Sequence, residues 1–172
     1  APEQSRIDQV KSDIGYHNIR VVSQKIKKDL PLTIDLSAVA KGYAVDVVAG
    51  LLEQNGISDY MVEIGGEIKI RGQNQRGVTW TIGIEKPALG RTGSMQSVTG
   101  DNIAIATSGD YRNYYEENGV RVSHTIDPTT GWPIKHNLAS VTVVTDSAAY
   151  ADAFATALNV LGPEKGFAIA EQ

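Results

Sequence analysis

Residues 38–71, AVAKGYAVDVVAGLLEQNGISDYMVEIGGEIKIR, decide the fold class because the spacing of the apolar residues changes within them. Over residues 38–54 apolar side chains recur at helical spacing, and the Asn-Gly pair that follows is typical of a helix C-terminus. The spacing then changes to period two over Tyr60–Ile64 and Glu67–Arg71, on either side of a Gly-Gly pair, as in a hairpin or a bulge. A long helix followed directly by paired strands predicts an α+β fold.

Outward from this segment, shorter apolar runs predict further elements. Strands are expected at Ile19–Ser23, Leu32–Asp35, Trp80–Glu85, Ser97–Thr99, Asn102–Ala106, Tyr111–Glu116, Val120–Thr125 and Leu138–Thr145. Helices are expected at residues 4–14, 147–161 and from 163 onward, and turns or loops at residues 25–28, 87–96 and 127–133. We therefore expect one α+β domain over residues 1–172, built on a mostly antiparallel sheet with two principal helices.

The composition excludes several classes of function. The chain has 172 residues with 16 basic and 20 acidic side chains, a formal net charge of −4. Nucleic-acid binders normally present a basic patch, so we expect no nucleic-acid partner. No run approaches the ~18 apolar residues that a membrane-spanning helix needs. The sequence has no Cys, which excludes disulfides, thiolate metal sites and Cys nucleophiles.

The transition from strand to helix at residues 35–43 has the residue types of an anion site. Ser37 is expected to cap the long helix, and the free amides of a first helical turn favour a negative charge. Lys41 is four residues further on and is expected on the same helical face. Amides, a hydroxyl and an ammonium group would then converge, as a diphosphate requires. The alternative is an ordinary capped helix with Lys41 in solvent.

Two further segments carry residues that suit a ligand or a base. Residues 107–110 include Ser108 and a glycine, which let backbone amides approach a ligand closely, although a simple turn is the better explanation of this segment taken alone. His124 comes near the end of a strand and before a rigid Asp-Pro turn. An imidazole has a pKa near neutrality and suits a general base. A structural histidine bonded to a backbone carbonyl is the open alternative.

The last long helix carries two oxygen-bearing side chains on a face made mostly of alanine. Asp152 and Thr156 are four residues apart and so share that face, where an unpaired charge is unfavourable. A hard cation such as Mg²⁺ would satisfy both oxygens and keep positions open for phosphate and water. A capping or polar contact of Asp152, with Thr156 bonding back to its own helix, is the alternative.

Taken in order, these segments resemble one family, the ApbE-type FAD:protein FMN transferases. The motifs that carry the resemblance are DLSAVAKGYAVD (35–46), EIGGEI (63–68), IATSGDY (105–111), SHTIDPTTGWP (123–133) and ADAFATAL (151–158). Five ordered motifs at matching spacing form a specific signature, and the match runs from about residue 15 to the end. The fold it implies is the α+β, T-fold-like architecture of that family.

The resemblance also implies a role for individual residues. Asp35, Lys41 and Ser108 match positions that bind FAD. The backbone carbonyl of Ala38 and the side chains of Asp152 and Thr156 match the Mg²⁺ ligands. His124 matches the histidine assigned as the base for the acceptor hydroxyl. With these roles, the metal neutralises charge on the diphosphate while the base activates the incoming hydroxyl.

The implied reaction is Mg²⁺-dependent cleavage of FAD. Its FMN part is transferred to a Thr or Ser hydroxyl of an acceptor flavoprotein, and AMP is released. Hydrolysis of FAD to FMN and AMP is an alternative for this family, and a non-catalytic FAD-binding module is another. The family is generally periplasmic or lipid-anchored outside the cytoplasmic membrane, and we expect the same location here.

The resemblance further implies a longer protein, because family members are normally about twice this length. The first helix, at residues 4–14, has no cap before it. We therefore expect the chain to be the carboxy-terminal part of such a protein, with an incomplete flavin pocket. An apolar surface meant for the other half predicts self-association. A third hypothesis is accordingly that the chain is a structural fragment that dimerises.

Overall fold

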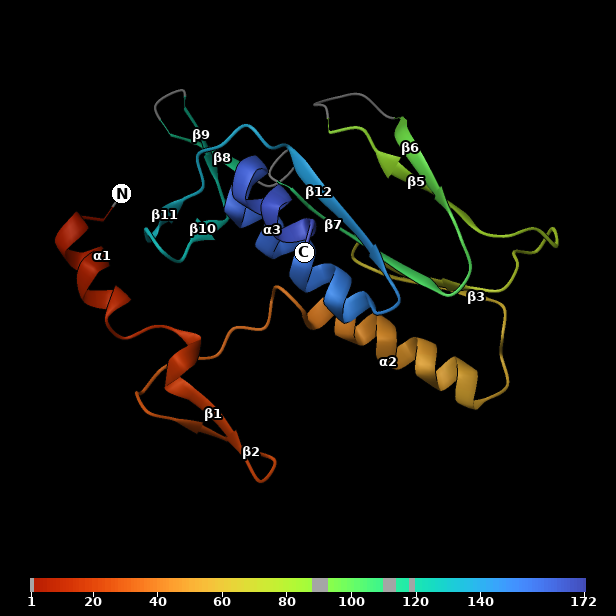
Figure 1. The fold of residues 1–172 in the computed structure, drawn as a ribbon, viewed down its shortest axis with the longest axis horizontal. Helices are drawn as coiled ribbons and strands as arrows, with labels where there is room; N and C mark the ends of the chain where they lie inside the picture. The colour runs from red at the N-terminus through yellow and green to blue at the C-terminus, as the bar shows by residue number, and fades with distance from the viewer. Residues whose placement is uncertain (1, 88–92, 110–113, 118–119) are drawn as a thin grey trace.

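The computed structural model describes residues 2–87, 93–109, 114–117 and 120–172, and Figure 1 shows their arrangement. The helices are α1 (Gln4–Lys11), the short 3-10 helix η1 (Tyr16–Asn18), α2 (Ala40–Gln54) and α3 (Ala148–Ala170). The strands are β1 (Ile19–Val22), β2 (Lys25–Lys28), β3 (Tyr60–Ile64), β4 (Glu67–Arg71), β5 (Thr81–Glu85), β6 (Ser94–Thr99), β7 (Ile103–Gly109), β8 (Tyr114–Glu117), β9 (Val120–Ser123), β10 (Ile126–Asp127), β11 (Trp132–Pro133) and β12 (Ser140–Thr145). Antiparallel strands and two long helices confirm the α+β fold.

A four-stranded antiparallel sheet in the order β12-β7-β4-β3 forms the centre of the molecule. In its register, Ile70 of β4 pairs with Ile103 of β7, and Ala106 of β7 pairs with Val143 of β12. Helix α3 packs on β7 and β12, while α2 packs on β3 and β4 and against α3. The two helices therefore contact each other and cover neighbouring parts of one sheet.

Small side chains let α3 approach the sheet closely. The buried residues form two clusters: Val45, Ala49, Tyr60, Val62, Ala104 and Ala148 in one, and Ala106, Ala151 and Ala155 in the other. Alanines of β7 thus face alanines of α3. A helix that lies this close to a strand brings its polar residues near the polar residues at the strand's end, and this proximity builds the cleft described below.

Polar contacts join the middle of α2 to the N-terminal end of α3. Asp46 of α2 accepts hydrogen bonds from the backbone N–H groups of Ala148 and Ala149, at 2.9 and 3.0 Å, and from the Ser147 hydroxyl at 2.8 Å. The Ser147 hydroxyl in turn accepts a hydrogen bond from the Tyr150 N–H and caps α3. Asp46 therefore satisfies amides that the first turn of α3 would otherwise leave without partners.

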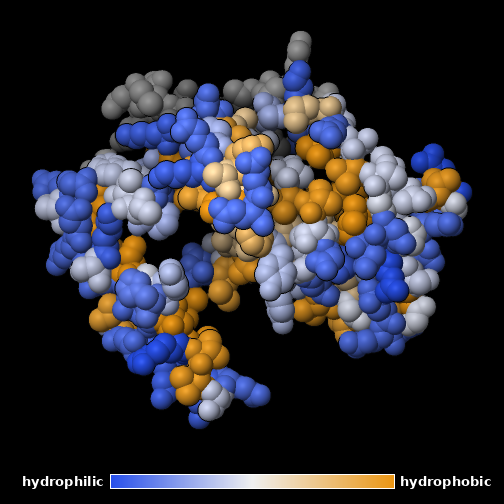
Figure 2. Space-filling view, viewed as in Figure 1, coloured by the Kyte–Doolittle hydropathy of each residue, from blue (hydrophilic) through white to orange (hydrophobic). Residues whose placement is uncertain are grey.

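The other strands form two-stranded hairpins around this centre: β1-β2, β5-β6, β8-β9 and β10-β11. Helix α1 reaches the β10-β11 hairpin, where the indole N–H of Trp132 donates to Gln4 Oε1 at 2.8 Å. Figure 2 shows the resulting outline, with an open hollow between the N-terminal segment and the rest of the molecule. In the part of the chain that the structure describes, no helix combines the length and apolarity needed to cross a membrane.

Several local predictions are corrected by the structure. Lys25–Lys28 is a strand paired with β1 rather than a turn, and residues 32–35 form no strand. Ser94–Gln96, expected in a loop, belongs to β6, and Thr107–Gly109, read as turn chemistry, completes β7. Residues 88–92, 110–113 and 118–119, which include parts of the expected loop and hairpin, lie outside the described residues.

The expected break in the last helix is confirmed. Gly162 has a φ of 77° inside α3 and separates a long first section from the segment that starts at Pro163. A left-handed backbone conformation is accessible to glycine without strain, and a proline is tolerated in the first turn of the helix that follows.

Candidate functional site

A cleft of about 590 Å³ lies where the N-terminus of α2, the end of β7, the start of β10 and the middle of α3 meet. Its walls are formed by Asp35, Ser37, Ala38, Lys41, Thr107, Ser108, Gly109, His124, Thr125, Ile126, Asp152, Thr156 and Asn159. Every site residue predicted from the sequence is in this set. Segments separated by more than a hundred residues therefore contribute to a single cavity.

The segment before α2 forms one wall of the cleft. Asp35 Oδ1 accepts a hydrogen bond from the backbone N–H of Ser37 at 2.8 Å, and this bond holds the pKa of Asp35 below its ordinary value. The prediction that Ser37 caps α2 is wrong, since the capping position is Val39, which has no side chain able to accept a hydrogen bond. Ser37 and Ala38 instead lie in the turn before the helix and line the cleft.

Lys41 follows directly and is held by a partner that the sequence analysis missed. Its Nζ donates to Glu67 Oε1 of β4 at 2.7 Å, although the Lys41 side chain stays 46% exposed. Gly65, with a φ of +61°, has no side chain, and a Cβ there would lie 3.1 Å from Cδ of Lys41. The Gly-Gly turn between β3 and β4 therefore leaves room for the lysine stem. The alternative in which Lys41 extends freely into solvent therefore does not hold.

Glu67 itself is a buried acid. It is 2% exposed, and its Oε2 has no hydrogen-bond partner among the described residues. Burial raises the pKa of Glu67, an effect that the ammonium of Lys41 partly offsets and the nearby Asp152 carboxylate reinforces. The residues of β4, EIKIR, alternate charged and apolar side chains, so nothing in the local sequence distinguishes this buried acid from an exposed one.

Asp152 is the second buried acid beside the cleft. It is 3% exposed, and its Oδ2 accepts a hydrogen bond from the backbone N–H of Gly42 at 3.0 Å. Gly42 lies so close to α3 that a Cβ there would be 2.1 Å from the carbonyl oxygen of Ala148. The polar contact foreseen for Asp152 thus exists. It fixes the carboxylate of a residue that lines the cleft.

Thr156 and Ser108 join α3 to the end of β7. Their hydroxyl oxygens are 3.0 Å apart and share a hydrogen bond. Thr156 therefore bonds across to the strand rather than back to its own helix. Because hydroxyls rotate freely, this pair can present a lone pair or a proton to a ligand.

His124 also lines the cleft; it follows β9 directly, and its side chain is exposed. The segment that follows is rigid, because Asp127 Oδ1 accepts hydrogen bonds from the N–H and the hydroxyl of Thr129, at 2.8 and 2.7 Å. These bonds hold the pKa of Asp127 below its ordinary value. An exposed imidazole that lines the cleft suits a base that acts on an incoming group.

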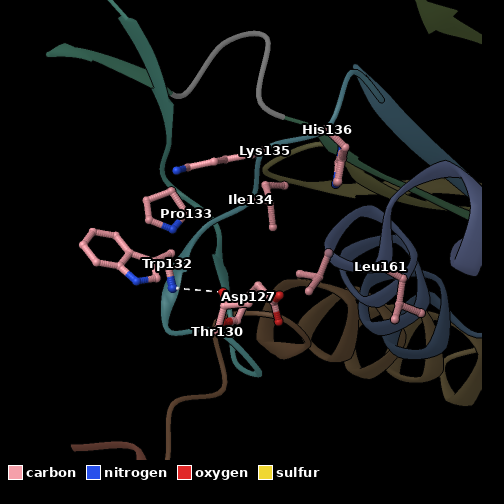
Figure 3. Close-up of a pocket in the computed structure, with 9 residues that line it drawn as sticks. Asp127, Thr130, Trp132, Pro133, Ile134, Lys135, His136 and Leu161 are labelled. Atoms are coloured by element: carbon pink, nitrogen blue, oxygen red, sulfur yellow. Dashed lines mark hydrogen bonds between the residues drawn. The ribbon is translucent and has the colours of Figure 1, made fainter. Parts of the chain in front are cut away.

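A second cavity, of about 410 Å³, lies behind the β10-β11 hairpin (Figure 3). Figure 3 shows Trp132, Pro133 and Ile134 along one side, with His136 and Leu161 on the side of α3. His136 Nε2 is 2.7 Å from the backbone oxygen of Asn159, which makes Nε2 the protonated nitrogen. This cavity therefore adjoins the first one through Asn159.

The oxygen atoms of the cleft suit a hard cation. Among the described residues, no three His, Cys, Asp or Glu side chains converge as a metal cluster. A cation would therefore depend on mixed oxygen donors, and the cleft offers the Asp152 carboxylate, the Thr156 hydroxyl and the Ala38 backbone carbonyl. Mg²⁺ typically uses one or two carboxylates, keeps several waters and takes its remaining ligands from a substrate phosphate. This donor set fits that pattern.

Comparison with known proteins gives consistent matches over nearly the whole chain. An FAD:protein FMN transferase of Vibrio cholerae is 47% identical over 171 residues, which is 99% of this chain and 51% of that protein. The Escherichia coli K12 protein of the same name is 49% identical over 170 residues, 95% of this chain and 48% of that protein. The chain thus spans about half the length of these relatives.

Solved structures agree with the fold. The apo flavinyl transferase ApbE of Pseudomonas stutzeri has a TM-score of 0.89 at 43% identity, covering 99% of this chain and 53% of that one. The flavin transferase ApbE of Vibrio cholerae has a TM-score of 0.88 at 46% identity, covering 99% and 54%. The model of the ApbE family matches residues 1–172. Motifs, fold and cleft agree with this match, and the chain belongs to the ApbE family.

Proposed function

We propose that this chain carries the catalytic cleft of an FAD:protein FMN transferase, which moves FMN from FAD to a Thr or Ser hydroxyl of an acceptor flavoprotein and releases AMP. The observation that carries the proposal is the convergence of Lys41, Asp152, Thr156 and His124 in one cleft from three distant segments. The names of relatives at 47% and 49% identity support the same reaction.

In this proposal the FAD diphosphate lies between the start of α2 and the middle of α3. Lys41 supplies a positive charge to it, and Ser108 supplies a hydroxyl donor. Asp152, Thr156 and the Ala38 carbonyl would hold Mg²⁺, which when bound neutralises phosphate charge and makes the phosphorus more electrophilic. The buried position of Asp152 suits this task, since a carboxylate fixed by the Gly42 N–H needs little reordering to bind a cation.

His124 acts on the acceptor. Its imidazole takes the proton of the acceptor hydroxyl as that oxygen attacks the phosphorus of the FMN half. A phosphoester bond forms to the acceptor oxygen, the bond from that phosphorus to the bridging oxygen of the diphosphate breaks, and AMP leaves with the bonding electron pair. The exposure of His124 in the lining of the cleft favours a macromolecular acceptor that approaches from solvent.

The test is flavin transfer by the full-length protein with FAD, Mg²⁺ and an acceptor flavoprotein. Covalent flavin is measured by fluorescence of the denatured acceptor, and AMP by chromatography. We expect the two in equal amounts. AMP without flavin on the acceptor would identify the reaction as hydrolysis, and FAD binding without either product would identify a binding module.

A histidine variant tests the proposed base. His124→Ala is expected to lower the transfer rate by about 10²–10⁴-fold, the usual range for loss of a positioned general base. FAD affinity should change little, because the role is exercised only at the acceptor hydroxyl. His17→Ala, an exposed histidine outside the cleft, is the matched control and should keep the rate. Weakened FAD binding with an unchanged rate at saturation would make His124 a binding residue.

A further inference from the structure

Asn159 is a buried polar residue of the cleft to which neither the motifs nor the proposed reaction gives a role. It is 2% exposed, it lines the cleft, and its side-chain oxygen Oδ1 has no hydrogen-bond partner among the described residues. Its backbone carbonyl is engaged, since it lies 2.7 Å from His136 Nε2. An amide oxygen buried without a donor is unfavourable for folding, so a ligand from outside the chain is the natural partner to look for.

The position of Asn159 on α3 relates it to the two proposed cation ligands. Asp152, Thr156 and Asn159 are spaced i, i+4 and i+7, which puts all three on one stripe of the helix. Helical side chains lean toward the N-terminus, so the Asn159 amide covers the turn that carries Thr156. Asn159 lies two turns from Asp152, roughly 10 Å along the axis, which favours contact through a water rather than a third direct ligand.

The balance of charge and donors in this region points to a cation. Among the described residues of the cleft and its wall, two buried side chains are acidic, Glu67 and Asp152, and one lysine, Lys41, can balance their negative charge. The ammonium of Lys41 already bonds Glu67 at 2.7 Å. Two buried acceptor oxygens, Glu67 Oε2 and Asn159 Oδ1, have no hydrogen-bond donor in the part of the chain that is described. Water bound to a divalent cation is a strong donor and suits such acceptors.

We propose that Asn159 is an outer residue of the cation site: its Oδ1 accepts a hydrogen bond from a water molecule on a divalent cation held by Asp152 and Thr156, and so positions that cation. The inference rests on the proposed function, because it needs the cation site at Asp152. It adds a residue that the motif ADAFATAL does not include. Partners of this kind that orient metal ligands typically contribute 10–100-fold to metal affinity.

The experiment measures binding of Mn²⁺ alone to the full-length protein without FAD, by the electron paramagnetic resonance signal of free Mn²⁺. Asn159→Leu is expected to weaken Mn²⁺ binding by about 10–100-fold. Asn159→Asp keeps an oxygen acceptor and should retain the affinity. Asn137→Leu replaces an exposed asparagine outside the cleft and should change nothing. Asn159→Ala removes the amide without adding bulk and repeats the test should leucine not fit.

A stability measurement separates this role from a structural one. In metal-free protein, Asn159→Leu should raise the midpoint of urea unfolding, since it replaces an unpartnered buried amide by an apolar side chain. A lowered midpoint together with unchanged Mn²⁺ affinity would make Asn159 a structural residue and overturn the inference.

Asp152→Asn distinguishes the inference from the proposed function. Loss of Mn²⁺ affinity in both Asp152→Asn and Asn159→Leu supports the inference. Loss in Asp152→Asn alone overturns it and leaves the proposed function in place. Unchanged affinity in both variants overturns the cation site itself, and the inference with it.

Discussion

Glu67 carries a carboxylate into the interior beside the cleft, where burial disfavours its ionised form. Its Oε1 accepts a hydrogen bond from the Lys41 ammonium at 2.7 Å, and its Oε2 has no hydrogen-bond partner among the described residues. A well-packed apolar residue is often more stable than a buried ion pair. We therefore interpret the ion pair of Lys41 and Glu67 as a contact that holds the lysine at the cleft, rather than as a source of stability.

Burial of the ionised Glu67 carboxylate destabilises the folded state, and this effect should appear in the pH dependence of the free energy of unfolding. Because burial raises the pKa of Glu67 above its ordinary value of 4.5, the folded state binds the proton more tightly than the unfolded state. This contribution is complete below the unfolded pKa and is lost as the pH rises through the folded pKa. Glu67→Gln removes the effect, so we expect the variant to gain stability relative to the parent protein between acidic and neutral pH.

Urea unfolding of both proteins at acidic and at neutral pH measures this difference. Glu63→Gln, an exposed carboxylate on the neighbouring strand, is the control and should follow the parent protein at both pH values. A parent protein and a Glu67→Gln variant with parallel pH profiles would contradict the assigned direction of the pKa shift.

At the scale of elements, the crossing of α2 and α3 determines where Asp152 lies. A Cβ on Gly42 would meet the Ala148 carbonyl oxygen at 2.1 Å and Asp152 Cβ at 2.8 Å, both in α3. Gly42→Ala therefore has to push the helices apart, and overpacking of this kind typically costs about 1–3 kcal/mol. We expect a lower free energy of unfolding and weaker cation binding together, because the Gly42 N–H also fixes the Asp152 carboxylate.

The same helix provides the control for this prediction. A Cβ on Gly50 would have no atom within 4 Å, so Gly50→Ala adds only helix propensity. It should raise the free energy of unfolding by about 0.5–1 kcal/mol. Equal effects of the two substitutions in chemical denaturation would show that the helices do not rely on close contact at Gly42.

The cap that α2 supplies to α3 predicts a second, opposite pH dependence. Burial alone would raise the pKa of Asp46, but the hydrogen bonds from Ala149, Ala148 and Ser147 outweigh it, and the pKa lies below its ordinary value of 3.8. This stabilisation is present above the unfolded pKa and is lost as the pH falls through the folded pKa. Asp46→Ala should cost about 1 kcal/mol at neutral pH, as for loss of an N-cap, and less in strong acid.

Thermal or urea unfolding at neutral and strongly acidic pH checks the effect of Asp46→Ala. Asp13→Ala, an exposed aspartate near the N-terminus, should leave stability unchanged. An equal loss for Asp46→Ala at both pH values would mean that its side chain stabilises by packing and not by charge.

Helices and strands whose apolar residues recur at a regular spacing could be predicted from the sequence, and those without such a pattern could not. The period-3.6 and period-two runs gave α2, β3 and β4 with nearly their observed bounds. The β1-β2 hairpin was missed because β2 is exposed throughout and has lysine at three of its four positions. Its turn also uses Ser23 and Gln24, at φ values of 50° and 61°, rather than a glycine. Backbone pairing and the ion pair between Arg20 and Asp29 join the two sides of that hairpin, and neither leaves an apolar pattern in the sequence.

The same difference applies to the cleft. Residues such as Asp152 and His124 stand out in the sequence because their chemistry conflicts with their surroundings or belongs to a dense motif. Asn159 is notable because its side-chain oxygen is buried without a partner among the described residues, which depends on the packing of α3 against β7. Glu67 is notable because it bonds Lys41, which depends on α2 lying beside β4. Their importance is a property of the tertiary structure.

At the scale of the whole molecule, the cleft is assembled from segments that share no local structure. The start of α2, the end of β7, the turn after β9 and the middle of α3 converge at one place because alanines let α3 lie close to the sheet. Large apolar side chains nevertheless remain exposed on the two long helices, among them Tyr43, Val47, Leu51, Tyr150, Phe154 and Phe167. Figure 2 shows apolar patches on this surface between polar ones.

The central claim is that Asp152 holds the cation through which this cleft binds the FAD diphosphate. The most direct measurement is the affinity of the full-length protein for FAD with and without Mg²⁺, by quenching of flavin fluorescence, in the parent protein and in Asp152→Asn. We expect Mg²⁺ to tighten FAD binding in the parent protein and to have no effect in the variant, while Asp146→Asn, an exposed neighbour, behaves as the parent does. An equal effect of Mg²⁺ on FAD binding in Asp152→Asn and in the parent protein would contradict the claim.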